Sequence, residues 1–215
     1  MNMTIRFEEE KDFHAVEELT RNAFWNLYFP GCAEHFLCHV MRSHKDFVKD
    51  LDFIALVDGS IVGSIMYTKS WLIAEDGETQ EIVSFGPLCV HPDFQRKGIG
   101  TALIEKTKKI ASEKNIPAIA IYGDPHNYCK HGFNNGIDYN VSNMEGEYPL
   151  GLLLLEIEEG FFGDKKWKLK QSEVYNLDNI KVEEFDRKFE YKEKKKEYSQ
   201  EFFKMMIRSY LRNFS

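Results

Sequence analysis

The sequence predicts an α/β fold, in which strands and helices alternate along the chain. A hydrophobic strand, Ile82 to Val90, leads through a basic, glycine-containing turn into an amphipathic helix, Gly98 to Lys114. Earlier in the chain, Asp58-Gly59-Ser60 is a hairpin signal between two apolar segments, residues 53–57 and 61–71. Apolar residues recur at strand spacing in some segments and at helix spacing in others. A fold in which helices pack on a sheet is therefore expected.

The other elements are expected in a definite order. Before the hairpin, the predicted elements are a strand at 4–7, a helix with an apolar stripe at 13–24 and a second helix at 32–41. After the helix at 98–114, they are a strand at 118–122, a short helix carrying Tyr128 and a buried strand within 150–157. The last part is predicted to hold a turn at 161–164, a strand at 167–174, a helix at 182–189 and a solvated charge run at 192–197.

The chain is expected to divide into a domain at residues 1–157 and an extension at 158–215, because the composition changes after Glu156. The final apolar residues recur at helical spacing and predict one amphipathic helix that contains Phe202, Phe203, Met206, Ile207, Tyr210, Leu211 and Phe214. That helix would pack on the protein's own core, form a homodimer contact or act as a lid.

Composition narrows the class of protein. With 215 residues, 43% of them hydrophobic, the chain can bury a substantial core. It shows neither a secretory leader pattern nor an apolar run near 18 residues, so we expect a cytoplasmic protein with no membrane association. A net charge of −7 argues against nucleic-acid binding and suits cationic amine substrates. The four cysteines lack paired spacing and are expected to be free thiols.

The turn at residues 91–100 is suited to binding a phosphate. The first turn of a helix presents unpaired backbone N–H groups and a partial positive charge. Gly98 and Gly100 are too close together for a P-loop, and Leu103 stands where a dinucleotide fingerprint needs Gly or Ala. Asp124 lies at the distance expected for a ribose-binding acid, which keeps the dinucleotide interpretation as a minor alternative.

A third interpretation fits every position of this turn. Val90 to Gly100 resembles the acetyl-CoA pyrophosphate loop of the Gcn5-related N-acetyltransferase (GNAT) superfamily, and Tyr128-x-x-x-Gly132-Phe133 resembles its second signature. The resemblance implies a mixed, mostly antiparallel sheet that is splayed between its fourth and fifth strands and flanked by helices. It covers residues 5–133 well and residues 134–157 loosely.

The resemblance also implies the residues that bind acetyl-CoA, the cosubstrate. Gly86-Pro87 inside a strand suggests a bulge, which would free backbone groups of Leu88, Cys89 and Val90 for the pantetheine arm. The pyrophosphate would lie against the turn residues Gln95, Arg96, Lys97, Gly98, Ile99, Gly100 and Thr101. Asp124 or Asn127 would replace the asparagine that relatives often carry before the signature Tyr128.

Acetyl transfer to an amine needs a proton donor for the departing thiolate and a base for the amine. Tyr128 is the expected general acid, with a packing role beneath the cofactor as the alternative. Glu81, on the strand before the turn, and Glu34 and His35, in the helix at 32–41, are the candidate bases. On a helical wheel Glu34 borders the apolar face, whereas His35 points away from it and has an exposed surface position as its alternative.

No metal site is expected. Cys32, His35 and His39 share one short helix, but three such ligands without a distant fourth are a weak signal. The sequence therefore predicts an acetyl-CoA-dependent N-acetyltransferase acting on a small-molecule primary amine. A protein or peptide N-acetyltransferase and a noncatalytic acyl-CoA-binding module are the alternatives.

Overall fold

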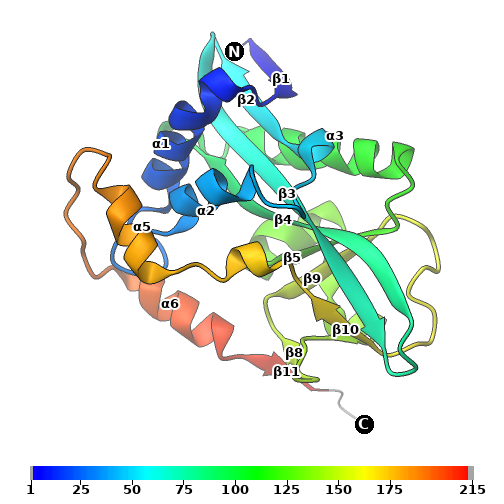
Figure 1. The fold of residues 1–215 in the computed structure, drawn as a ribbon. Helices are drawn as coiled ribbons and strands as arrows, with labels where there is room; N and C mark the ends of the chain where they lie inside the picture. The colour runs from blue at the N-terminus through cyan, green and yellow to red at the C-terminus, as the bar shows by residue number, and fades with distance from the viewer. Residues whose placement is uncertain (1, 213–215) are drawn as a thin grey trace.

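The computed structural model describes residues 2–212, which form one large sheet with helices on both faces (Figure 1). The strands are β1 (Met3–Phe7), β2 (Phe53–Val57), β3 (Ser60–Ala74), β4 (Thr79–Val90), β5 (Ala118–Tyr122), β6 (Asn134–Asn135), β7 (Val141–Ser142), β8 (Tyr148–Pro149), β9 (Leu152–Glu156), β10 (Trp167–Lys170) and β11 (Tyr210–Leu211). The helices are α1 (Phe13–Phe24), α2 (Glu34–Met41), α3 (Ile99–Glu113), α4 (Pro125–Tyr128), α5 (Asn179–Asp186) and α6 (Tyr198–Ile207).

The nine-stranded sheet follows the order β1-β2-β3-β4-β5-β9-β6, with β10 added against β3 and β7. All pairs along the main path are antiparallel except β4 with β5, and β8 pairs separately with β11. This is the mixed, mostly antiparallel sheet that the sequence predicts.

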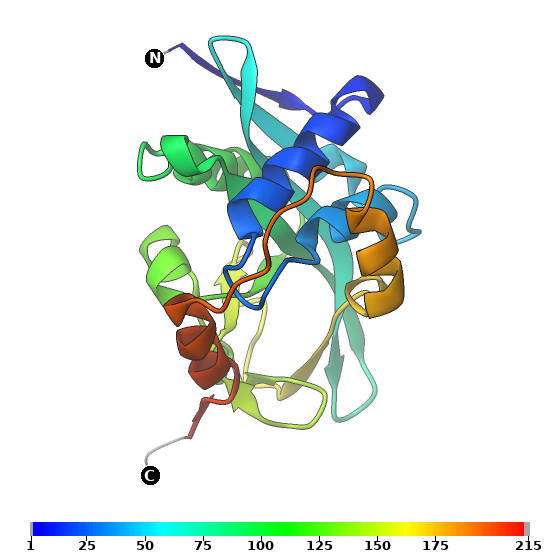
Figure 2. The same cartoon turned by 90° about the vertical axis from the view of Figure 1, so that its left-hand side faces the viewer.

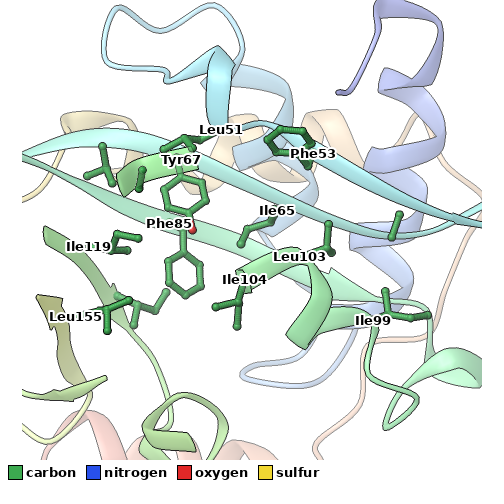
Figure 3. Close-up of a cluster of buried hydrophobic side chains, with 14 of the residues drawn as sticks. Leu51, Phe53, Ile65, Tyr67, Phe85, Ile99, Leu103, Ile104, Ile119 and Leu155 are labelled. Atoms are coloured by element: carbon green, nitrogen blue, oxygen red, sulfur yellow. The ribbon is translucent and has the colours of Figure 1, made fainter. Parts of the chain in front are cut away.

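Strand alternation divides the core between the two faces of the sheet, because successive side chains point to opposite sides. Phe53 and Ala55 of β2 pack in the cluster that contains Leu103 of α3, and Figure 3 shows this cluster. Ile54, between them in sequence, packs instead with Val16 of α1. Hence α1 and α2 cover one face of the sheet and α3 covers the other.

The predicted final helix is only partly correct. It ends at Ile207, and Tyr210 and Leu211 form β11 instead, because they pair with β8 of the sheet domain. Its apolar face is buried at Met206, whereas Phe202 is 48% exposed. Phe214 lies outside the described residues.

The segment after residue 157 contacts the helices on the α1–α2 face. Its strand β10 pairs with β3, and its helix α5 packs Phe185 against Phe36 and His39 of α2, with ring centroids 5.3 and 4.5 Å apart. The guanidinium Nε of Arg21 in α1 donates to Asp186 of α5 at 2.7 Å.

The linker between α5 and α6, residues 187–197, crosses the C-terminal end of α1 (Figure 2). The sequence predicts its charge run as a solvated face, and most of these side chains are exposed, but the backbone binds Asn26. The Asn26 amide donates to Glu193 O at 3.0 Å, and its Oδ1 accepts from Lys195 N at 3.1 Å and Gly31 N at 2.8 Å. Gln200 Nε2 also donates to Asn26 O at 2.9 Å. Asn26 therefore fixes the loop that precedes α2.

Asn26→Gly should lower the free energy of unfolding by about 1–3 kcal/mol, since it removes three hydrogen bonds yet allows the native φ of 61°. Urea denaturation measures this loss. Asn115→Gly is the matched control, because Asn115 also has a positive φ, 55°, at the exposed end of α3. Equal losses in both variants would show that chain entropy, not the linker contacts, is responsible.

Candidate active site

A cavity of about 880 Å³ opens where β4 and β5 part. Three groups of residues form its walls: the first turn of α3, the edges of β4 and β5 with α4, and a roof from the α1–α2 loop and the C-terminal segment. The cavity therefore touches both sequence motifs and the segment that precedes α2.

The cavity exists because β4 separates from β5 after Ser84. Only Val83 and Ser84 of β4 pair with β5, and the register with β3 shifts where Gly86 and Pro87 stand opposite Met66. Two residues opposite one are a β-bulge, which bends the strand and ends regular pairing. The predicted bulge is confirmed. The edge of β4 from Leu88 to Val90 consequently faces the cavity instead of another strand.

The first turn of α3 supplies one end of the cavity with hydrogen-bond donors. Gly98 caps the helix with φ 84°, a left-handed conformation that favours glycine. The first intrahelical bond runs from Ala102 N to Gly98 O at 2.9 Å. The N–H groups of residues 99–101 therefore have no intrahelical acceptor, and the positive end of the helix dipole lies beside them.

Most of the predicted cofactor residues line this cavity. They are Leu88, Cys89, Val90, Gln95, Arg96, Gly98, Ile99, Gly100, Thr101, Asn127 and Tyr128. Two lie elsewhere: Lys97 Nζ donates to Asp93 O at 2.7 Å, and Asp124 caps α4 by accepting from His126 N at 2.9 Å. Of the two residues offered in place of the family asparagine, Asn127 is the one that reaches the cavity.

Tyr128 lies against the end of β5. Its ring meets Phe85 edge-on with centroids 5.5 Å apart, and its edge lies so close to Gly123 that a Cβ there would collide with it. Burial is the main cause that raises the pKa of Tyr128 well above its usual value. The phenol is therefore protonated at neutral pH and can donate a hydrogen bond into the cavity.

Glu34 begins α2 and lines the roof of the cavity. Its carboxylate accepts from Ala33 N at 3.0 Å. Burial raises the pKa of Glu34 to about 7, although backbone hydrogen bonds favour its charged form. Its neighbour Tyr28 has a pKa raised to about 12, by burial first and then by the charge of Glu34.

The other two candidate bases lie outside the cavity. Glu81 is half exposed on β4 and pairs with Lys69 at 3.0 Å. His35 is fully buried, with Nε2 3.3 Å from Asp186, and burial lowers its pKa to about 4. The exposed position considered for His35 is wrong, because α5 covers the side of α2 that the helical wheel leaves free.

Several cavity residues have no counterpart among the sequence-based predictions, and two of them, Gln171 and Tyr175, come from the C-terminal segment. Gln171 directly follows β10 and Tyr175 lies in the turn after it, far along the chain from both motifs. The Tyr175 hydroxyl accepts from Thr68 at 3.2 Å and donates to Gly86 O at 3.5 Å. No motif signals them, since they reach the cavity only because β10 pairs with β3.

The described residues 2–212 contain neither a metal-binding cluster nor a membrane-spanning helix. Within this range, no three His, Cys, Asp or Glu side chains are grouped to hold a metal ion. None of the helices in the same range has the length and hydropathy needed to cross a bilayer.

Comparison with known proteins gives the family to which this protein belongs. The model of the acetyltransferase (GNAT) family matches residues 20–133, more than half of the chain, and the chain belongs to this family. Acetyltransferase ECA0875 of Pectobacterium atrosepticum is 29% identical over 157 residues, which are 73% of this chain and 99% of the relative. "Probable hydrolase YhcX" of Bacillus subtilis is 30% identical over 149 residues, 60% of this chain, but the match spans only 27% of that relative's length.

A solved structure supports the fold. The GNAT family N-acetyltransferase YhbS of Escherichia coli, crystallised with CoA, superposes with a TM-score of 0.71 at 19% identity. The match covers 82% of this chain and 93% of that one. The GNAT fold that the motifs predict is confirmed, and the family match over residues 20–133 gives the class of acyltransferase enzymes.

Glu34 should make the protein's stability depend on pH. Because folding raises its pKa, the free energy of unfolding should fall as the pH rises from about 4.5 to about 7.5, by at most about 3 kcal/mol. Urea denaturation at pH 5 and pH 8 measures the difference. Glu34→Gln should remove this part of the slope, whereas Glu81→Gln, at an exposed position, should keep it. Equal slopes in the wild type and Glu34→Gln would contradict the burial of this carboxyl.

Proposed function

We propose that this protein transfers the acetyl group of acetyl-CoA to the primary amine of a small molecule. One observation carries the proposal: a single cavity joins the first turn of α3, the free edge of β4, Tyr128 and Glu34. These are the anion site, the arm-binding edge, the acid and the base that the reaction needs.

The cavity walls fit CoA at two places. The unpaired N–H groups at residues 99–101 and the Arg96 guanidinium favour a pyrophosphate at the α3 end. The free edge of β4 offers backbone donors and acceptors to the amide groups of a pantetheine arm. The CoA bound in the structural neighbour supports the same assignment here.

The two titratable side chains divide the proton transfers between them. An amine with a pKa near 10.4 is neutral in only about one part in 2,500 at pH 7. Glu34, with a pKa of about 7, suits the removal of its proton at neutral pH. Acetyl-CoA supplies the thioester that the neutral amine attacks. The C–S bond of the adduct breaks, and Tyr128, held as a phenol, donates its proton to the departing thiolate. The second amine proton and the proton held by Glu34 pass to solvent, and Tyr128 takes a proton back from solvent, so that one proton is released per acetyl transfer.

The roof favours a small acceptor over a protein. Tyr28 and Tyr175 cover the cavity from two separate segments, and both segments are tied down by hydrogen bonds. A protein N-acetyltransferase needs an open groove for an extended chain. A noncatalytic module would need neither the acid nor the base that both line this cavity.

The test is thiol release from acetyl-CoA in the presence of single amines, with the acetylated product identified by mass spectrometry. The expected result is amine-dependent release that Glu34→Gln slows, with loss of the rising limb near pH 7 in the pH–rate profile. Thiol release without an acetylated amine would refute the proposal.

Gly98→Val should abolish stabilisation by CoA. A ligand at a hundredfold excess over its Kd adds about 2.7 kcal/mol to the wild type, which a thermal-shift titration detects. Gly77→Val is the matched control, since Gly77 has φ 87° and, like Gly98, leaves open space within 4 Å of an added Cβ, but it lies in the distant β3–β4 turn. Loss of the CoA shift in both variants would point to backbone strain instead of the binding site.

Tyr128→Phe should lower kcat by about 10²–10⁴-fold while leaving CoA affinity nearly unchanged. The substitution removes only the hydroxyl, so the packing against Phe85 is kept. Steady-state kinetics and CoA titration measure the two effects separately. Unchanged turnover would assign Tyr128 to packing, and a large loss of CoA affinity would assign it to binding.

A further inference from the structure

Part of the lining that Glu34 shares comes from segments outside the cofactor motifs. Phe24 and Tyr28 belong to the end of α1 and the loop after it, and Gln171 and Tyr175 belong to the C-terminal segment. Glu34 and Tyr28 both line this cavity, and after burial the charges of Glu34 and of Asp124, which caps α4 outside the lining, contribute to the raised pKa of Tyr28. This part of the cavity is the one left for the acceptor once CoA occupies the α3 end and the edge of β4.

The acceptor part of the cavity holds little charge. Among the described residues that line the cavity, Glu34 is the only acid, although the chain carries 35 Asp and Glu in total. The lining cations Arg96 and Lys130 lie on the turn before α3 and just after Tyr128, on the cofactor side. A second ammonium group beside Glu34 would lose its hydration without gaining a partner, which is unfavourable.

The remaining walls are aromatic. Tyr28 lies 5.8 Å from Phe24 and stacks on Phe203 of α6 at 4.3 Å, measured between ring centroids. Tyr175 comes from the turn after β10, in the C-terminal segment. Aromatic faces bind apolar bodies and also attract a single cation near their ring centres.

Both walls are fixed before any acceptor arrives. Tyr175 is held by its hydrogen bonds to Thr68 and to Gly86 O at the bulge, and Tyr28 follows Asn26, which the linker clamps. A preformed compartment selects its ligand by shape and charge, and it loses less conformational entropy on binding than a mobile loop does.

Resting on the proposed function, we propose that the acceptor is a monoamine, with one ammonium group on a compact aromatic or apolar body. The ammonium is recognised by Glu34, and the body lies against Tyr28 and Tyr175. Gln171, a neutral side chain in this wall, keeps the compartment limited to one positive charge.

The first experiment compares three acceptor probes with the wild type and acetyl-CoA. These are phenethylamine, with one charge and one ring; spermidine, with three charges and no ring; and a tetrapeptide with a free N-terminal alanine. Phenethylamine should have a kcat/KM at least about tenfold above the other two, the ratio expected from one unpaired buried charge. A higher kcat/KM for spermidine or the peptide would overturn the monoamine inference and leave acetyl transfer established.

The second experiment changes the charge of the compartment. Gln171→Glu adds a second carboxylate, on a side chain of nearly the same shape as glutamine. It should raise the ratio of the kcat/KM of a diamine to that of phenethylamine by about tenfold. The diamines tested have three to six carbons. Gln80→Glu, on the β3–β4 hairpin away from the cavity, is the matched control and should leave the ratio unchanged. A merely structural role for Gln171 would not move this ratio.

The CoA-induced thermal shift separates the possible failures. If the wild type shows the shift and acetylates amines, but Gln171→Glu keeps the wild-type ratio together with the shift, the assignment of the acceptor wall is wrong. If the wild type binds CoA and acetylates none of the probes, or shows no CoA shift, the proposed function itself fails.

Discussion

The bulge at Gly86 and Pro87 is the constraint on which the site depends. A sheet that continued its pairing past Ser84 would bring β4 and β5 together and close the cavity. The extra residue opposite Met66 turns β4 away, and the last part of the strand then exposes backbone groups. The same bend directs the chain into α3, so that its first turn points into the gap. One local irregularity therefore provides both the cavity and its anion-binding end.

The C-terminal segment completes what the bulge opens. Tyr175 bonds to Gly86 O, so the roof is tied to the bulge itself, while α5 covers α2 and the linker holds Asn26. These contacts join residues more than 80 positions apart in the chain. They fix the loop carrying Tyr28 and the helix carrying Glu34 relative to β4. One side of the cavity comes from residues of the two sequence motifs, and the other depends on long-range contacts of the C-terminal segment.

The sequence predicts the α3 and β4 walls of the cavity well because their signals are local. Gly98, the turn before it and the strand–turn–helix order can be recognised from adjacent residues, and the bulge follows from Gly86-Pro87. The wall that the C-terminal segment contributes could not be predicted in this way. Gln171 reaches the cavity through a strand pairing, and the position of His35 depends on α5 covering its side of α2. Helical periodicity finds an apolar face but not the element that will cover a polar one.

Burial is the main cause that raises the pKa values of both Glu34 and Tyr128, the base and the acid of the proposed reaction. Removing water from a carboxyl or a phenol disfavours the charged form, so the pKa of each rises. Glu34 starts low and reaches about 7, where it can both accept and return a proton. Tyr128 starts near 10 and moves higher, so it remains a donor. His35, buried nearby on the same helix, moves the opposite way and stays neutral, because its charged form is the cation. Among these three side chains only Glu34 both lines the cavity and has a pKa near neutral pH, which supports the proposal that it, and not His35, is the base.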